Sequence, residues 1–316
     1  MVRLKKTVVS FCVGTGRCGT TFLAELGRME PSVAASHERL RLPACYHMFC
    51  KWHGISSDPE GFLMDRERAI EQDLEAHHVS FEASALLSHS ILELFERFDA
   101  RFLLLVRRPD ATVASFAVRG WFLDPIPWGD PLRPPTIPEG VEPRHFFGRN
   151  LPRGTEEFER WTKLSQIGKL GWFWNARNRA IVDQLAQLPS SHRRICRLED
   201  LDFDHYREVA AFLGWNTEMA RTDFDALADR RPNAGPNIPL DPRAWPVSAV
   251  AEFEREVGTL ASALGYEHRI ARLMSGAEAV VKTGAGVSRT LVVEEVVAAL
   301  GDGAIGTAKT GMREPS

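Results

Sequence analysis

Residues 8–23 read VVSFCVGTGRCGTTFL, and the rest of the chain is best understood outward from them. The first part of this segment is mostly β-branched or apolar, a run long enough for one buried strand. Glycines follow at positions 14, 16 and 19, and apolar residues then recur with helical spacing at Phe22, Leu23, Leu26 and Met29. A strand, a glycine turn and a helix start bring backbone N–H groups and a helix N-terminus to one point. The segment therefore predicts an α/β fold with a phosphate or sulfate site.

The glycine loop differs from that of nucleotide triphosphatases in the position of its basic residue. Gly14 and Gly19 have the expected spacing, but Thr20 stands where those proteins carry lysine, and the basic side chain is Arg17, inside the loop. A loop without that lysine is poorly equipped to hold a γ-phosphate. From the residues alone, an ordinary strand–helix turn is the alternative interpretation.

Residues 16–21, Gly-Arg-Cys-Gly-Thr-Thr, resemble the 5′-phosphosulfate loop of the PAPS-dependent sulfotransferases. PAPS, 3′-phosphoadenosine 5′-phosphosulfate, is the sulfuryl donor of that family. The resemblance implies that this loop binds the donor's 5′-phosphosulfate, and that its basic residue neutralises the bridging oxygen. The implied donor-binding residues are Gly16, Arg17, Cys18, Gly19, Thr20 and Thr21, although close packing of a small side chain is the simpler reason for Cys18.

A second informative segment, residues 101–119, reads RFLLLVRRPDATVASFAVR. Its continuous apolar run predicts a buried parallel strand, and the proline after it suits the first turn of a helix. Arg107 stands at the carboxyl end of that strand, and Ser115 and Arg119 are four apart and would share a helix face. Guanidinium groups suit phosphate because of their fork of donors. A surface salt-bridge cluster is the alternative.

The same segment resembles the 3′-phosphate motif of the sulfotransferases, which implies that Arg107, Ser115 and Arg119 bind the donor's 3′-phosphate. Its strand ends Val-Arg-Arg, where a Walker B strand would end in an acidic residue that holds Mg²⁺. The segment therefore argues against a kinase or ATPase, and no metal is expected. Cysteines and histidines at 45–78 match no zinc-finger spacing either.

Residues 32–36 predict a short strand that ends at His37 and Glu38. Strand ends beside a phosphate loop are where α/β proteins place their chemistry. In some branches of the sulfotransferase family a glutamate at about this place acts as the base, so the resemblance favours Glu38. His37 is the rival, because other members use a histidine, although it lies elsewhere in their chains. Both residues could also be a solvated helix cap.

The remaining pattern predicts further elements in order. They are a substrate-facing excursion from residue 39 followed by a polar helix at 65–78, a strand at 79–83, a helix at 90–98, a proline-rich ordered excursion at 121–152, two helices within 155–188, a strand at 194–201, and helices at 206–213, 247–264 and 292–300. A basic loop at 230–236 loosely resembles the loop that closes over the nucleotide in the family, which implicates Arg231 and Asn233.

Composition sets limits on partners and compartment. The 316 residues carry a net charge of −3, so no general attraction to nucleic acid or an anionic membrane is expected. The N-terminus runs directly into the first strand without a signal peptide, and no apolar run approaches the ~20 residues that span a bilayer. Five cysteines without paired spacing indicate reduced thiols. We therefore expect a cytoplasmic protein.

These patterns predict one α/β domain over residues 1–270, with a central parallel sheet flanked by helices as in the P-loop-like sulfotransferase fold. Residues 271–316 form a C-terminal extension without an assigned role. The resemblance implies in-line transfer of a sulfuryl group from PAPS to a hydroxyl or amine of a small-molecule or carbohydrate acceptor, with Arg17 and Glu38, or His37, in catalytic roles. The alternatives are a nucleotide-binding protein without catalysis and an atypical P-loop kinase. The sequence defines neither the acceptor nor the oligomeric state.

Overall fold

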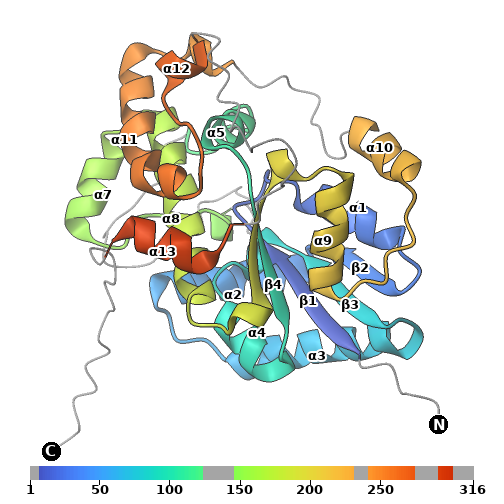
Figure 1. Ribbon diagram of the computed structural model, residues 1–316. Coiled ribbons are helices and arrows are strands. Elements are labelled where there is room, and N and C mark those ends of the chain that lie inside the picture. The colour runs from blue at the N-terminus through green and yellow to red at the C-terminus, as the bar shows by residue number, and fades with distance from the viewer. Residues whose placement is uncertain (1–6, 124–145, 231–240, 275–290, 302–316) are drawn as a thin grey trace, which may run out of the picture.

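The computed structural model describes residues 7–123, 146–230, 241–274 and 291–301 (Figure 1). A five-stranded sheet with the order β2-β3-β1-β4-β5 forms its centre, and every neighbouring pair is parallel. The strands are β1 Val8–Val13, β2 Val33–His37, β3 Val79–Ala83, β4 Arg101–Val106 and β5 Arg193–Arg197. The predicted α/β fold with a central parallel sheet is thus confirmed.

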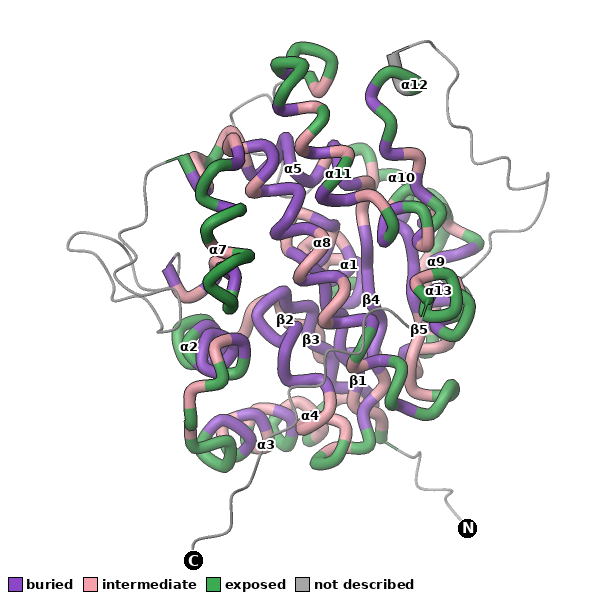
Figure 2. The backbone as a smooth tube through the Cα atoms, turned by 90° about the vertical axis from the view of Figure 1, so that its left-hand side faces the viewer, coloured by how far each residue is buried: buried purple, intermediate pink, exposed green. Residues whose placement is uncertain are grey.

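The pleat of the sheet divides the interior into two hydrophobic cores. Alternate residues of a strand point to opposite faces. Phe11 and Val13 of β1 accordingly belong to one core, and Cys12 belongs to the other. Leu104 and Leu105 of β4 separate in the same way. Both faces are covered, which explains why the central strand β4 is continuously apolar and buried from Phe102 to Val106 (Figure 2).

Helices cover both faces of the sheet (Figure 1). On one face lie α1 Thr20–Arg28, α9 Phe203–Leu213 and α10 Arg221–Arg230. On the other face lie α2 Arg41–His53, α3 Pro59–Ala76, α4 Ile91–Phe98, α5 Pro109–Ala117, α7 Thr155–Thr162, α8 Gln166–Leu185, α11 Val247–Ala263, α12 Ile270–Met274 and α13 Val293–Leu300. Short 3₁₀ turns occupy Ala85–Leu87, Ser190–His192, Leu198–Asp200 and Pro242–Ala244.

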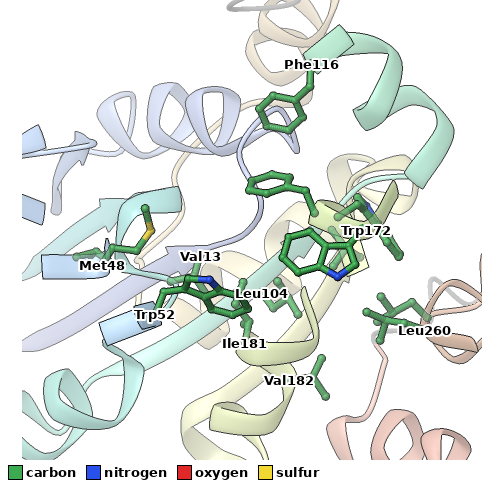
Figure 3. Packing of buried hydrophobic residues seen from close by; sticks show 14 of the residues in the cluster. Val13, Met48, Trp52, Leu104, Phe116, Trp172, Ile181, Val182 and Leu260 are labelled. Atoms are coloured by element: carbon green, nitrogen blue, oxygen red, sulfur yellow. The ribbon is translucent and has the colours of Figure 1, made fainter. Parts of the chain in front are cut away.

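Helix α8 lies at the centre of the larger core (Figure 3). Trp172 and Trp174 are only 5% and 0% exposed, so both are core residues. The Trp174 indole also donates to the Arg107 carbonyl at 3.2 Å, which ties the helix to the end of β4.

The described part of the C-terminal segment packs on this same core. Leu291 forms an antiparallel bridge with Ile195 of β5, and Val293 and Val296 are buried. Arg193 of β5 pairs with Glu294 of α13. Residues 291–300 therefore cover the outer strand of the sheet.

Local expectations failed at three places. Residues 41–53 form α2, where a substrate-facing excursion and no helix had been predicted, because Ala44, Met48 and Trp52 build one buried helical face among polar residues. Helix α10 was not expected, since its sequence is mostly polar. Strand β5 ends at Arg197, and the predicted strand to 201 continues as a 3₁₀ turn.

Within the described residues, no helix has both the length and the apolarity that crossing a membrane requires.

A half-buried and a buried histidine, His53 and His89, predict a loss of stability in mild acid. Burial, and then the charge of Arg153, lowers the pKa of His53 to about 4, and burial also lowers that of His89. An unfolded histidine has a pKa of about 6.5, so below that pH the unfolded chain binds protons that the folded chain excludes. The free energy of unfolding should therefore fall as the pH drops from about 6.5 to 4. Urea denaturation at several pH values in this range would measure the free energy of unfolding. Its slope against pH should be smaller for His53→Gln than for the wild type, by the equivalent of about one proton. An unchanged slope would contradict this prediction.

Candidate active site

The loop between β1 and α1 has a backbone that only glycine accommodates at its tightest points. A Cβ on Gly14 would lie 2.5 Å from Cys18 Sγ and 2.6 Å from the Leu105 carbonyl oxygen. Gly19 has a φ of 102°, and a Cβ there would lie 2.6 Å from Leu198 Cδ1. Gly16 and Arg17 are also left-handed, with φ of 82° and 57°. Such a loop forms a concave nest of N–H groups, which suits an anion.

The start of α1 adds to this anion site. Gly19 is the N-cap and offers no side chain to the first-turn N–H groups. The first turn of α1 has no acidic residue, so the positive end of the helix dipole is not offset locally. The hydroxyls of Thr20 and Thr21 stand at the same end. A phosphate or sulfate would therefore be stabilised at this point.

The loop lies at the point where the connections that follow neighbouring strands pass to opposite faces of the sheet. The chain leaves β1 for α1 on one face, whereas it leaves the neighbouring β4 for α5 on the opposite face. The carboxyl ends of β1 and β4 thus form a topological switch point, the usual ligand crevice of open α/β sheets. Arg107 directly follows β4 and so stands at this crevice.

The structure brings together the two arginine-bearing motifs of the sequence. Arg17 Nε donates to Ser115 Oγ at 3.0 Å, and Arg107 Nη1 donates to the Arg17 carbonyl at 3.2 Å. Burial, together with the nearby positive charges of Arg119 and Arg107, lowers the pKa of Arg17 to about 10. Helix α5 ends at Ala117, so Arg119 lies in the following turn and not on the predicted helix face. Three guanidinium groups therefore share one electropositive region.

A fourth arginine, which sequence reasoning missed, lies behind the loop. Arg177 of α8 is buried, and its guanidinium donates to neutral groups, the Asn150 side chain and the Gly148 carbonyl, both at 2.9 Å. Burial lowers its pKa to about 10. Its Nη1 also donates to the Ala85 carbonyl at 3.5 Å, and a Cβ on Gly16 would lie 3.6 Å from the Ala85 methyl group. In sequence Arg177 does not differ from Arg179 of the same helix, whose side chain is 23% exposed, so no local signal marked it.

His37 reaches the loop from the end of β2. Strand β3 separates β2 from β1, so the predicted strand lies at the sheet edge and only its end approaches the loop. His37 Nε2 is 3.2 Å from both Thr20 Oγ1 and Thr21 Oγ1. Burial lowers the pKa of His37, which keeps its ring neutral at pH 7.

Glu38 follows His37 in a left-handed conformation, with a φ of 49°. Its side chain is 26% exposed, and its Oε2 lies 3.7 Å from Arg41 Nε. Burial lowers the pKa of both His37 and Arg17, and the negative charge of Glu38 opposes both shifts, so the carboxylate lies within electrostatic reach of both groups. The structure thus gathers the candidate base and the arginine cluster at one end of the sheet.

Three further residues were predicted to bind the donor, namely Cys18, Arg231 and Asn233. Cys18 is buried, and burial raises the pKa of its thiol, which fits a packing role against Gly14. Arg231 and Asn233 lie outside the described residues. Within the described ranges, no group of histidine, cysteine and carboxylate side chains has the arrangement that holds a metal ion.

Comparison with protein-family models finds no match, and a search of curated proteins also finds none. Solved structures that resemble this chain in fold include the following three. A sulfotransferase domain from the curacin biosynthetic pathway is 15% identical, with 83% of this chain and 98% of that chain covered and a TM-score of 0.44. A sulfotransferase domain from the Synechococcus PCC 7002 olefin synthase is 15% identical, with 84% and 97% covered and a TM-score of 0.47. A sulfotransferase from Alicyclobacillus acidocaldarius is 16% identical, with 82% and 96% covered and a TM-score of 0.45.

Proposed function

We propose that this chain is a sulfotransferase that moves a sulfuryl group from PAPS to a hydroxyl or amine of a small-molecule or carbohydrate acceptor. The observation that carries the proposal is the direct linkage of Arg17, Ser115 and Arg107 at the switch point. Through it, a glycine loop and a strand–helix arginine motif form one continuous anion site.

PAPS is suited to such a site because it carries negative charge at two separate positions. The glycine loop and the start of α1 would hold the 5′-phosphosulfate through backbone N–H groups and threonine hydroxyls. Arg107, Ser115 and Arg119 would hold the 3′-phosphate, where guanidinium groups form strong charge-assisted bonds. Arginines would neutralise the donor directly, without the carboxylate-bound Mg²⁺ of a kinase.

The proposed reaction is an in-line displacement at sulfur. An acceptor oxygen or nitrogen forms a bond to sulfur while the bond from sulfur to the bridging phosphate oxygen breaks, and that oxygen keeps the electron pair. Arg17 stabilises the charge that develops on the leaving oxygen. Glu38 takes the acceptor's proton, and the neutral ring of His37 orients the threonine hydroxyls. Adenosine 3′,5′-bisphosphate and the sulfated acceptor are the products.

Donor recognition gives the most direct test. In calorimetry with EDTA, adenosine 3′,5′-bisphosphate should bind at least ~100-fold more tightly than AMP, because charge-assisted hydrogen bonds to the 3′-phosphate contribute about 1.5–3 kcal/mol each. Adenosine 2′,5′-bisphosphate has the same charge and is the control. Its affinity should exceed that of AMP by a much smaller factor. Equal affinities for the 3′,5′-bisphosphate and AMP would contradict the assignment of the arginine motif. Preferential binding of ATP with Mg²⁺ would favour an atypical kinase instead.

A further inference from the structure

The turn that carries Glu38 has an unusual backbone. Glu38 and Leu40 are both left-handed, with φ of 49° and 54°. A non-glycine residue in this region is disfavoured, and it persists where surrounding contacts determine it. Two such residues so close together therefore require a firm anchor on the neighbouring structure.

A buried ion pair provides that anchor at Arg39, between the two strained residues. Glu82 Oε1, from β3, accepts the Arg39 backbone N–H at 3.0 Å. Arg66 Nη2, from α3, donates to the Arg39 carbonyl at 2.9 Å. Arg66 Nη1 and Glu82 Oε2 also pair with each other. Together they hold the two peptide groups that join Arg39 to Glu38 and to Leu40.

The remaining contacts of the turn lead to the same elements. The Arg39 guanidinium donates to both carboxylate oxygens of Asp73 on α3, at 2.8 and 3.1 Å. The Glu38 backbone N–H donates to the Ala83 carbonyl at the end of β3, at 3.1 Å. The turn is therefore fixed to the sheet and to α3 at several points.

Stability alone gives a poor explanation of this pair. The Arg66 and Glu82 side chains are only 2% and 6% exposed. Burial raises the pKa of Glu82 even though Arg66 and Arg39 oppose that shift. Desolvating two charges is costly, and a hydrophobic pair of similar volume is often equally stable. A requirement for fixed geometry accounts better for an ion pair at this position.

We propose that Arg66 and Glu82 are positioning residues, which hold the Glu38 turn so that its carboxylate faces the acceptor beside the phosphate loop. The inference rests on the proposed function, because it assigns the acceptor's proton to Glu38. Arg66 is suited to the task because its rigid fork reaches Glu82 and the Arg39 carbonyl at the same time.

Arg66→Lys tests this role because lysine keeps the buried positive charge but lacks the fork. We expect a melting temperature near that of the wild type and a donor affinity within about 2-fold. The kcat should fall by ~10-fold or more, since small displacements of a reacting group are costly in rate. Hydrogen exchange in residues 38–41 should become faster. The double variant Arg66→Met with Glu82→Leu, which removes both charges, should show the same pattern if the lysine variant folds poorly.

Two controls separate positioning from a general loss of structure. Arg160 also donates to both carboxylate oxygens of a buried glutamate, Glu256, but joins α7 to α11. Arg160→Lys should leave kcat and exchange in residues 38–41 unchanged. In a Glu38→Gln background, Arg66→Lys should cause no further loss of kcat, because both changes act through one carboxylate.

Unchanged exchange in residues 38–41 in both Arg66 variants would overturn the proposal. Faster exchange with unchanged kcat would also overturn it, and so would a further loss of kcat in the Glu38→Gln background. A wild-type protein that binds adenosine 3′,5′-bisphosphate but transfers no sulfuryl group would instead overturn the proposed function. The exchange rates alone would then decide whether the ion pair holds the turn.

Discussion

Glu38→Gln should lower turnover by ~10²–10⁴ while leaving donor affinity unchanged. Glutamine has nearly the size of glutamate and keeps a hydrogen-bond acceptor, but it takes up no proton from the acceptor. The loss of the long, partly exposed contact with Arg41 should cost little stability. Steady-state kinetics with a sulfated-product assay would measure turnover, and calorimetry with adenosine 3′,5′-bisphosphate would measure binding.

Glu25→Gln is a matched control for this change. Glu25 pairs with Arg28 three residues on, as Glu38 pairs with Arg41, and its side chain is 39% exposed. We expect Glu25→Gln to turn over like the wild type. Normal turnover in Glu38→Gln together with a loss in His37→Gln would transfer the role of base to His37. A wild-type protein that binds the nucleotide and sulfates no acceptor would be a binding protein without catalysis.

The parts of the site that the sequence predicted depend on local signals. The loop from Gly14 to Gly19 requires glycine for a local reason at Gly16 and Gly19, namely a left-handed backbone. The apolar run before Arg107 likewise specifies a buried strand by itself. Parallel strands place their carboxyl ends at one edge, so the two motifs were expected to meet.

The parts that escaped prediction depend on the order of the strands and on packing between distant segments. The strand end at His37 was expected beside the phosphate loop, but no local pattern shows that β3 lies between β1 and β2 or that His37 contacts Thr20. Arg177 and Arg66 resemble ordinary surface arginines in sequence, yet both are buried. Arg177 binds Asn150 and Arg66 pairs with Glu82, and neither pair has a sequence spacing that predicts a contact.

Arg107→Ala should weaken binding of adenosine 3′,5′-bisphosphate by about 2–5 kcal/mol, the range for removal of one partner from a buried hydrogen-bonded charge pair. The residue stands at the end of β4, and its guanidinium contacts the Arg17 carbonyl at 3.2 Å. It would thus bind the 3′-phosphate and also support the loop. Calorimetry on the variant and the wild type would measure the change.

Two comparisons separate these contributions. Arg101 stands at the opposite end of β4 and also donates to a main-chain carbonyl, that of Phe212, at 2.7 Å, so Arg101→Ala controls for loss of an arginine from this strand. It should leave nucleotide affinity unchanged. AMP, which lacks the 3′-phosphate, reports on the loop alone, and the effect of Arg107→Ala should be much smaller for it. An equally large effect on both nucleotides would mean that Arg107 acts by holding the Arg17 backbone in its left-handed conformation, and the 3′-phosphate would then need another partner.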